Sequence, residues 1–182
     1  MCLAACLAAG AAGAAERLPA SGTVEVLFEP GDDTDAAIGV AIDGARSQVL
    51  VQAYIFTSRP IAKALVRAAA RGVDVRVLAD AGNHREPRRN ALPMLVEAGI
   101  SVALEVDYPN AHNKVIVIDP EGGQPAVVTG SYNFTWTAEH RNAENLLILR
   151  GNPALARRYA ENWHRHARSA QVIGADLKPA HR

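Results

Sequence analysis

The chain has 182 residues, of which 49% are hydrophobic and 21% are charged, which excludes a disordered or fibrous protein and fits one domain with a sizeable core. Nineteen basic and 19 acidic residues balance, so the net charge by itself does not indicate a nucleic-acid-binding protein. Basic residues nevertheless gather locally, most densely at Arg85, Arg88 and Arg89. Such a cluster fits either contact with a phosphate backbone or an ordinary solvated surface.

Residues 1–15 contain no charged side chain and are mostly Ala, Leu and Gly. Small residues immediately before Glu16 are typical of a signal-peptidase site, so the pattern predicts an exported protein, periplasmic or secreted, whose single domain is residues 16–182. The string Leu3-Ala4-Ala5-Cys6 resembles a lipoprotein cleavage box, which keeps a lipoprotein open. Both cysteines fall in this leader, which predicts no disulfide framework and no thiolate metal site, and no second apolar run is long enough to span a membrane.

The first half of the chain alternates between strand and helix patterns. Hydrophobic residues alternate in the predicted strands and recur every three or four residues in the predicted helices. The predicted strands are 23–28, 48–54, 73–78 and 100–106, and the predicted helices are 35–46, 60–71 and 87–98. This order is typical of crossover units and predicts an α/β fold with a mixed, mostly parallel β-sheet flanked by helices on both faces.

The second half is organised differently. Two strands, 114–119 and 126–129, are joined by a Gly-rich turn and predict a hairpin. A short helical segment follows Asn133, then a strand at 145–149 and a helix from Asn152-Pro153 to about Arg168. No periodic pattern continues after Ala170.

Chemistry-bearing residues stand at the start of the predicted strand 114–119. Side chains two residues apart on a strand point to the same face, so His112 and Lys114 are expected to lie together. The residues that follow them are apolar, which puts a titratable histidine and a cation at the mouth of a buried strand. Because the pKa of histidine lies near neutrality, His112 suits a nucleophile or a general acid.

The end of the next strand supplies hydrogen-bonding groups. Ser131 offers a hydroxyl and Asn133 an amide, and with Lys114 they form the donor-rich, positive cradle that a phosphoryl transition state needs. A catalytic histidine also needs a carboxylate on its other ring nitrogen, and Glu144, at the start of a buried strand, is the candidate.

These residues form two ordered blocks, His-x-Lys-x4-Asp followed by Gly-Ser-x-Asn, and the pattern resembles the phospholipase D superfamily. The matching residues are His112, Lys114, Asp119, Gly130, Ser131 and Asn133. The longer strings 130–135 and 142–145 are similar to the small bacterial endonuclease branch, whose eukaryotic relative is the mitochondrial cardiolipin hydrolase Zucchini. The resemblance covers about Val24 to Trp163, with one departure: the segment between Asp119 and Gly130 is longer than the family usually has.

The resemblance implies a phospholipase D-like fold and a two-step reaction that needs no metal and no cofactor. His112 would attack phosphorus to form a phosphohistidine, Lys114 and Asn133 would bind the phosphoryl oxygens, and Asp119 and Gly130 would be structural. A second histidine, from a second copy of the motif, would protonate the leaving oxygen and activate water. Since the chain carries one copy, the resemblance implies a homodimer with its active site on the two-fold axis.

Three functions compete at this point. The motif favours an endonuclease that cuts DNA or RNA, with Arg85, Arg88 and Arg89 as candidate contacts to the polymer. The alternative keeps the chemistry and takes a phospholipid such as cardiolipin as substrate. A binding protein with an inactive site would be expected to lack His112 or Lys114, and both are present.

Overall fold

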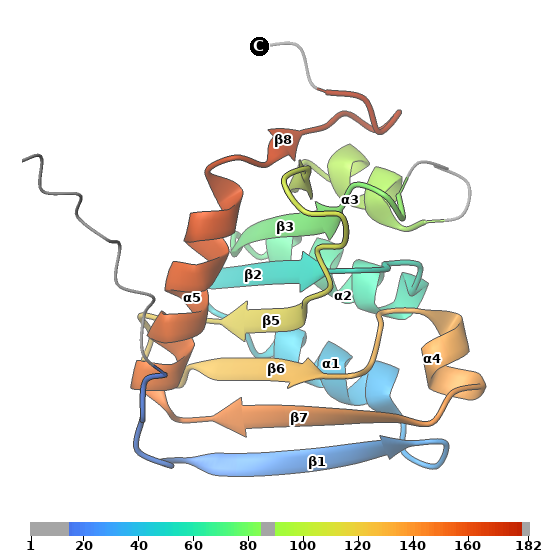
Figure 1. The fold of residues 1–182 in the computed structure, drawn as a ribbon. Coiled ribbons are helices and arrows are strands. Elements are labelled where there is room, and N and C mark those ends of the chain that lie inside the picture. Colours follow the sequence, from blue (N-terminus) through green and yellow to red (C-terminus); the bar gives the residue numbers. More distant parts are fainter. Residues whose placement is uncertain (1–14, 85–89, 180–182) are drawn as a thin grey trace, which may run out of the picture.

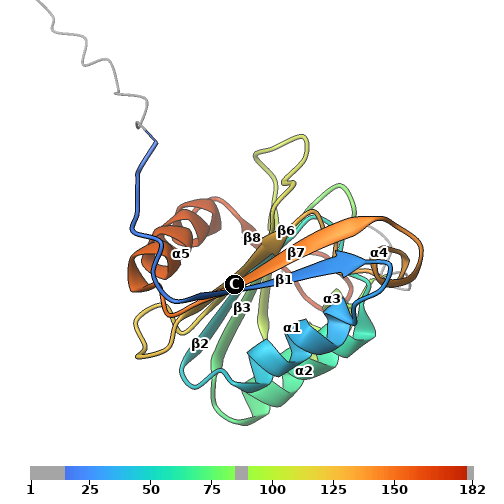
Figure 2. The ribbon, with the colours of Figure 1, turned by 90° about the horizontal axis from the view of Figure 1, so that it is seen from below.

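The computed structural model describes residues 15–84 and 90–179, which form one eight-stranded β-sheet with helices on both faces (Figures 1 and 2). The strands lie in the order β1-β7-β6-β5-β2-β3-β4-β8. Their bounds are β1 Thr23–Glu29, β2 Gln48–Ala53, β3 Asp74–Asp80, β4 Ser101–Glu105, β5 Lys114–Ile118, β6 Ala126–Gly130, β7 Glu144–Arg150 and β8 Gln171–Val172. The helices are α1 Thr34–Asp43, α2 Arg59–Ala70, α3 Leu92–Glu97, α4 Trp136–His140 and α5 Pro153–Ala167.

The mixed α/β class is confirmed, but the expectation of a mostly parallel sheet is wrong. Only β2–β3 and β3–β4 are parallel, while the other five neighbouring pairs are antiparallel. The strand–helix alternation produces parallel crossovers only from β2 to β4. After β4 the chain returns without a helix and places β5 antiparallel to β2, and β1 pairs at the sheet edge with β7, far along the chain.

Two hydrophobic layers hold the helices to the sheet. α1, α2 and α3 cover one face, where Ile38, Ile42, Ile61 and Leu65 are fully buried, and α5 covers the other (Figure 2). On the α5 side the Trp163 indole N–H donates to a β2 carbonyl over 2.9 Å, so a hydrogen bond adds to the apolar contact.

Two predicted elements differ from the structure. The helix expected at 87–98 is shorter, since α3 begins at Leu92; residues 85–89 lie outside the described part of the chain. The segment after Ala170 contains β8, which pairs with β4. A two-residue strand is too short to leave a periodic pattern in the sequence.

Strand direction decides where the functional residues meet. β2 and β6 end where β5 and β7 begin, so these strand ends lie together along one side of the sheet, on the right of Figure 1. We call this side the sheet edge that carries the site. Residues from four separate segments are therefore brought together at one edge. No helix in the described ranges has the length and apolar composition needed to cross a membrane.

Candidate active site

His112 and Lys114 meet where β5 begins. The Lys114 Nζ atom lies 2.7 Å from His112 Nδ1 and 3.3 Å from Nε2, and it donates to the His112 carbonyl oxygen over 2.9 Å. An ammonium group can donate to an imidazole nitrogen only when that nitrogen carries no proton, so the contact fits a neutral ring. The lysine is buried, at 6% exposure, while the histidine is exposed and accessible to a substrate.

Tyr54, which follows β2, packs against both residues. Its ring centroid lies 4.1 Å from that of His112, and the Lys114 Nζ atom lies 4.8 Å from it in a cation–π contact. The Tyr54 hydroxyl donates to Asn110 over 3.1 Å. Tyr54 thus holds His112 and Lys114 in place through contacts with both side chains. The sequence pattern did not single out this role, because the contact joins segments that are distant along the chain.

Burial also changes the pKa of Lys114. Removal from water lowers the pKa of Lys114 from its ordinary value, and the negative charge of Glu144 offsets only part of that effect. Glu144 thus acts on the site through its charge, which favours the ammonium form of Lys114 beside the histidine.

Ser131 and Glu144 hold each other. The Ser131 hydroxyl donates to Glu144 Oε2 over 2.5 Å and accepts the backbone N–H of Asn145 over 3.0 Å, while Asn142 donates to Glu144 Oε1 over 2.8 Å. Because the single hydroxyl proton is used in this way, Ser131 holds β6 to β7 in the free protein instead of pointing a donor at a phosphate. Glu144 does not bond to His112 of the same chain, so its predicted role as partner of that ring is not met within one chain.

Asn133 lies three residues after the end of β6, at the end of the sheet where β5 begins. Its side-chain Oδ1 is buried and has no hydrogen-bond partner within the described residues. Buried polar atoms are nearly always paired, so an unpaired one at a site calls for a ligand or a water. Rotation of the amide by 180° presents Nδ2 at the same point, which would supply the donor that a phosphoryl oxygen needs.

The remaining motif residues are placed by backbone geometry. A Cβ atom on Gly130 would lie 2.2 Å from the Asn145 carbonyl oxygen, so only glycine allows β6 and β7 to approach this closely. Asp119 lies at the opposite end of β5 from His112 and accepts N–H bonds from the backbone of residues 46–48 over 2.7–2.9 Å. Burial raises the pKa of Asp119, but these hydrogen bonds outweigh it and lower the pKa overall. Its contacts support the expected structural role.

A further carboxylate, not found by the sequence reasoning, supports the segment that carries the histidine. Asp80 is 1% exposed, and its Oδ2 atom accepts the backbone N–H of Ala111, next to His112, over 2.8 Å. Its Oδ1 atom accepts two donors from Asn83, and the ring of buried His84 contacts the Asp80 carbonyl over 2.7 Å. Asp80 therefore anchors the backbone just before the candidate nucleophile.

Two expectations concern nucleic-acid contacts and metal ligands. Arg85, Arg88 and Arg89 lie outside the described residues. Within residues 15–84 and 90–179, no group of three or more His, Cys, Asp or Glu side chains is arranged to hold a metal ion.

Comparison with known proteins agrees with this geometry. Residues 38–167 match the family model described as cardiolipin synthase, PLD-like domain. The phospholipase D of Rickettsia conorii is 39% identical over 140 residues, which cover 77% of this chain and 67% of that protein. The mitochondrial cardiolipin hydrolase of Mus musculus is 31% identical over 109 residues, covering 60% of this chain and 47% of the relative.

A solved structure is similar over nearly its whole length. The phospholipase D family member Nuc from Salmonella typhimurium superposes with a TM-score of 0.77 at 31% identity, covering 85% of this chain and 99% of Nuc. The family model, the relatives and the fold agree with the motif at the sheet edge. The chain therefore belongs to the phospholipase D superfamily of phosphodiesterase hydrolases.

Proposed function

We propose that this protein is an endonuclease that hydrolyses DNA or RNA phosphodiester bonds without a metal ion, through a phosphohistidine intermediate. One observation carries the proposal: the buried Lys114 ammonium contacts the exposed ring of His112, at the end of the sheet near which Asn133 has an unpaired amide oxygen. A nucleophile, a fixed positive charge and an amide are the groups that a phosphodiester substrate requires.

The reaction proceeds in two displacements. A ring nitrogen of neutral His112 attacks phosphorus, the P–O bond to the leaving alcohol breaks, and a second histidine, in its imidazolium form, donates the proton that this oxygen needs and becomes neutral. The second imidazole then takes a proton from water, which attacks the phosphohistidine and releases the phosphate product and the free ring. Lys114 and Asn133 stabilise the charge on the non-bridging oxygens in both steps.

The second imidazole comes, in this proposal, from a second copy of the chain. No other described histidine contacts His112, and no described carboxylate bonds to its ring, so one chain supplies half of the groups. A homodimer whose two-fold axis passes between two His112 side chains supplies the rest.

An exposed apolar stripe beside the site suits such a partner. Val24, Val26 and Phe28 alternate along β1, are 50–60% exposed, and lie on the face of the sheet opposite the buried Leu27. α5 packs on β2, β4, β5 and β6 and leaves this end of the sheet uncovered (Figure 2). The stripe reaches the site, because Phe28 pairs with Asn145. Burial of this stripe against a second copy would stabilise the dimer.

The choice of a nucleic acid rests on likeness. Residues 130–135 and 142–145 resemble the small bacterial endonuclease branch, and the chain is similar to nearly the whole of Nuc, against about half of the cardiolipin hydrolase. Phospholipid hydrolysis is the second candidate, since the Rickettsia relatives are named phospholipase D. We further propose export to the periplasm or the exterior, from the uncharged segment 1–15.

The test compares the two substrate classes directly. The protein is incubated with labelled single- and double-stranded oligonucleotides and, separately, with cardiolipin vesicles, beside His112→Ala and a control, His164→Ala, which removes an exposed histidine on α5. We expect cleavage of oligonucleotides that is lost in His112→Ala and kept in His164→Ala. Cleavage of cardiolipin alone would establish the second candidate, and oligonucleotide cleavage that persists in His112→Ala would contradict the site.

A further inference from the structure

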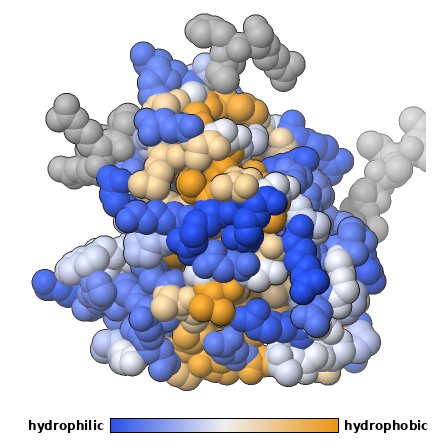
Figure 3. Space-filling view, turned by 180° about the vertical axis from the view of Figure 1, so that it is seen from behind, coloured by the Kyte–Doolittle hydropathy of each residue, from blue (hydrophilic) through white to orange (hydrophobic). Residues whose placement is uncertain are grey.

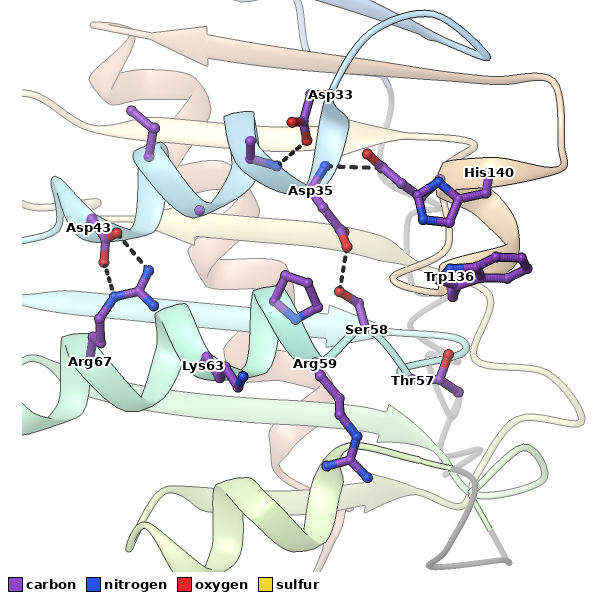
Figure 4. Close-up of a pocket in the computed structure, with 15 residues that line it drawn as sticks. Asp33, Asp35, Asp43, Thr57, Ser58, Arg59, Lys63, Arg67, Trp136 and His140 are labelled. Carbon is purple, nitrogen blue, oxygen red and sulfur yellow. Dashed lines mark hydrogen bonds and ion pairs between the residues drawn. The ribbon is translucent and has the colours of Figure 1, made fainter.

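A groove outside the catalytic residues opens on the face covered by α1 and α2. It encloses about 700 Å³ between these two helices, and α4 closes one end (Figure 4). Figure 3 shows this face, where a hydrophilic band crosses the surface between hydrophobic patches. The catalytic step described above uses none of the residues that line the groove.

Backbone contacts join the groove to the active site. Thr57 and Ser58, which line it, both donate their N–H groups to the Phe134 carbonyl oxygen over 2.8 Å, and Phe134 directly follows Asn133. Figure 4 shows Thr57 and Trp136 at the same end of the groove, with the Asp43–Arg67 ion pair at the other end. One end of the groove is therefore attached by hydrogen bonds to the residue that follows Asn133.

Two cations in the groove have no partner. Arg59 and Lys63 are exposed, lie one turn apart on α2, and make no ion pair or hydrogen bond with any described residue. Arg67, one turn further along, is neutralised by Asp43 over 2.7 Å. The Cβ atoms of residues four apart on a helix are about 5–6 Å apart, and the long side chains of Arg59 and Lys63 leave two unpaired positive charges for the phosphates of an extended strand.

The acidic side chains of the groove are already engaged. Asp33 caps α1, while Asp35 and Glu139 both contact the Tyr132 hydroxyl over 2.9 and 2.5 Å. Burial raises the pKa of both of these carboxyls, which favours their neutral forms.

Trp136 supplies an aromatic surface at the end nearest the catalytic residues. Its side chain is 55% exposed, unusual for so large an apolar group, and contacts with His140 and Arg141 hold the indole in place. Base–aromatic stacking is tolerant of sequence and is a common way to bind single strands.

We propose that this groove binds the single-stranded nucleic-acid segment that runs on from the scissile phosphate, with a base stacked on Trp136 and phosphates on Arg59 and Lys63. The proposal rests on the nuclease function proposed above and adds the class of substrate, a single or locally unpaired strand.

The test measures binding in the full chain carrying His112→Ala, so that the probe, a fluorescein-labelled oligothymidylate, is not cut. We expect Trp136→Ala to weaken binding about tenfold or more, as the loss of one stacked base does. We expect Arg59→Gln with Lys63→Gln to weaken binding and to lower the slope of log affinity against log salt by about 1.4, or about 0.7 for each lost phosphate contact. The matched control, Arg46→Gln with Arg168→Gln, removes two exposed cations outside the groove and should keep the parent affinity and slope.

Intrinsic fluorescence gives an independent readout. The chain has two tryptophans, and because Trp163 is 4% exposed, quenching by iodide reports on Trp136. Bound oligothymidylate should protect Trp136 from iodide. The proposal would be overturned if Trp136→Ala and the Arg59→Gln with Lys63→Gln variant both kept the affinity and the salt slope of the parent. It would also be overturned if cardiolipin vesicles protected Trp136 from iodide and the oligonucleotide did not. Cleavage of oligonucleotides by the wild-type chain separates the two claims: cleavage with unaffected groove variants contradicts the groove alone, and no cleavage contradicts both.

Discussion

Replacement of Asp80 by Asn tests whether the buried carboxylate positions the candidate nucleophile. Oδ1 accepts two donors from Asn83 and Oδ2 accepts the Ala111 N–H, so an amide in this place must turn its NH₂ group toward one of these donors. The loss of a buried hydrogen bond to a charged group costs about 2–3 kcal/mol. In a chain of this size that corresponds to a fall in Tm of about 4–12 °C.

The catalytic effect should exceed the effect on folding. A displacement of a reacting group by about 1 Å can cost about 100-fold in rate, and Ala111 is the residue before His112. We therefore expect kcat to fall about 10- to 100-fold with KM little changed, measured on an oligonucleotide well below the Tm of the variant.

The matched control is Asp74→Asn, the same change at the other end of β3. Its carboxylate is 42% exposed and pairs with Arg76 at the surface, where an ion pair is worth about 0–1 kcal/mol. This variant should retain both kcat and Tm nearly intact. If Asp80→Asn lost stability but kept the wild-type kcat, Asp80 would be structural only, and the positioning argument would be refuted.

Three other residues of the motif, Gly130, Asp119 and Lys114, each give a testable prediction. Gly130→Ala should destabilise the fold by about 3 kcal/mol in urea unfolding, because its Cβ would collide with the Asn145 carbonyl oxygen. The control, Gly39→Ala on α1, has nothing within 4 Å of the added Cβ and should stabilise the fold by up to about 1 kcal/mol, and equal effects of the two substitutions would refute the close approach of β6 and β7. Asp119→Asn should destabilise the protein at neutral pH. Since the pKa of Asp119 is lowered in the folded state, the difference in Tm between variant and wild type should shrink as the pH falls through that pKa, and a Tm difference that does not depend on pH would contradict this. Because the pKa of Lys114 is lowered, activity that needs its ammonium form should decline as the pH rises, and the decline should begin at a lower pH than for an ordinary lysine. A pH–rate profile that stays flat up to the pKa of an ordinary lysine would argue against a role for the charged Lys114.

Local patterns carried much of the fold and part of the site. Apolar alternation and the Asn152 cap are local features, so most predicted strands and helices begin and end within a few residues of the structure. The contact between His112 and Lys114 follows from the two-residue period of a strand. These features needed no knowledge of distant segments.

The features that the sequence could not predict depend on the pairing of strands that are distant along the chain. The antiparallel pairings of β5 with β2 and of β1 with β7 could not be predicted from local patterns, and the first of them also brought Tyr54 against His112. The close approach of β6 and β7 turned the Ser131 hydroxyl toward Glu144, and the fold alone delivered Asp80 to the backbone of Ala111. None of these contacts joins residues with a fixed spacing along the chain.

The most direct test of the central claim is oligonucleotide cleavage by the chain in excess EDTA, with His112→Ala in parallel. The account predicts cleavage that is insensitive to EDTA and absent in the variant, because Lys114 and Asn133 stabilise the phosphoryl charge and His112 forms the intermediate. Cleavage that is lost on chelation, or that survives in His112→Ala, would contradict it.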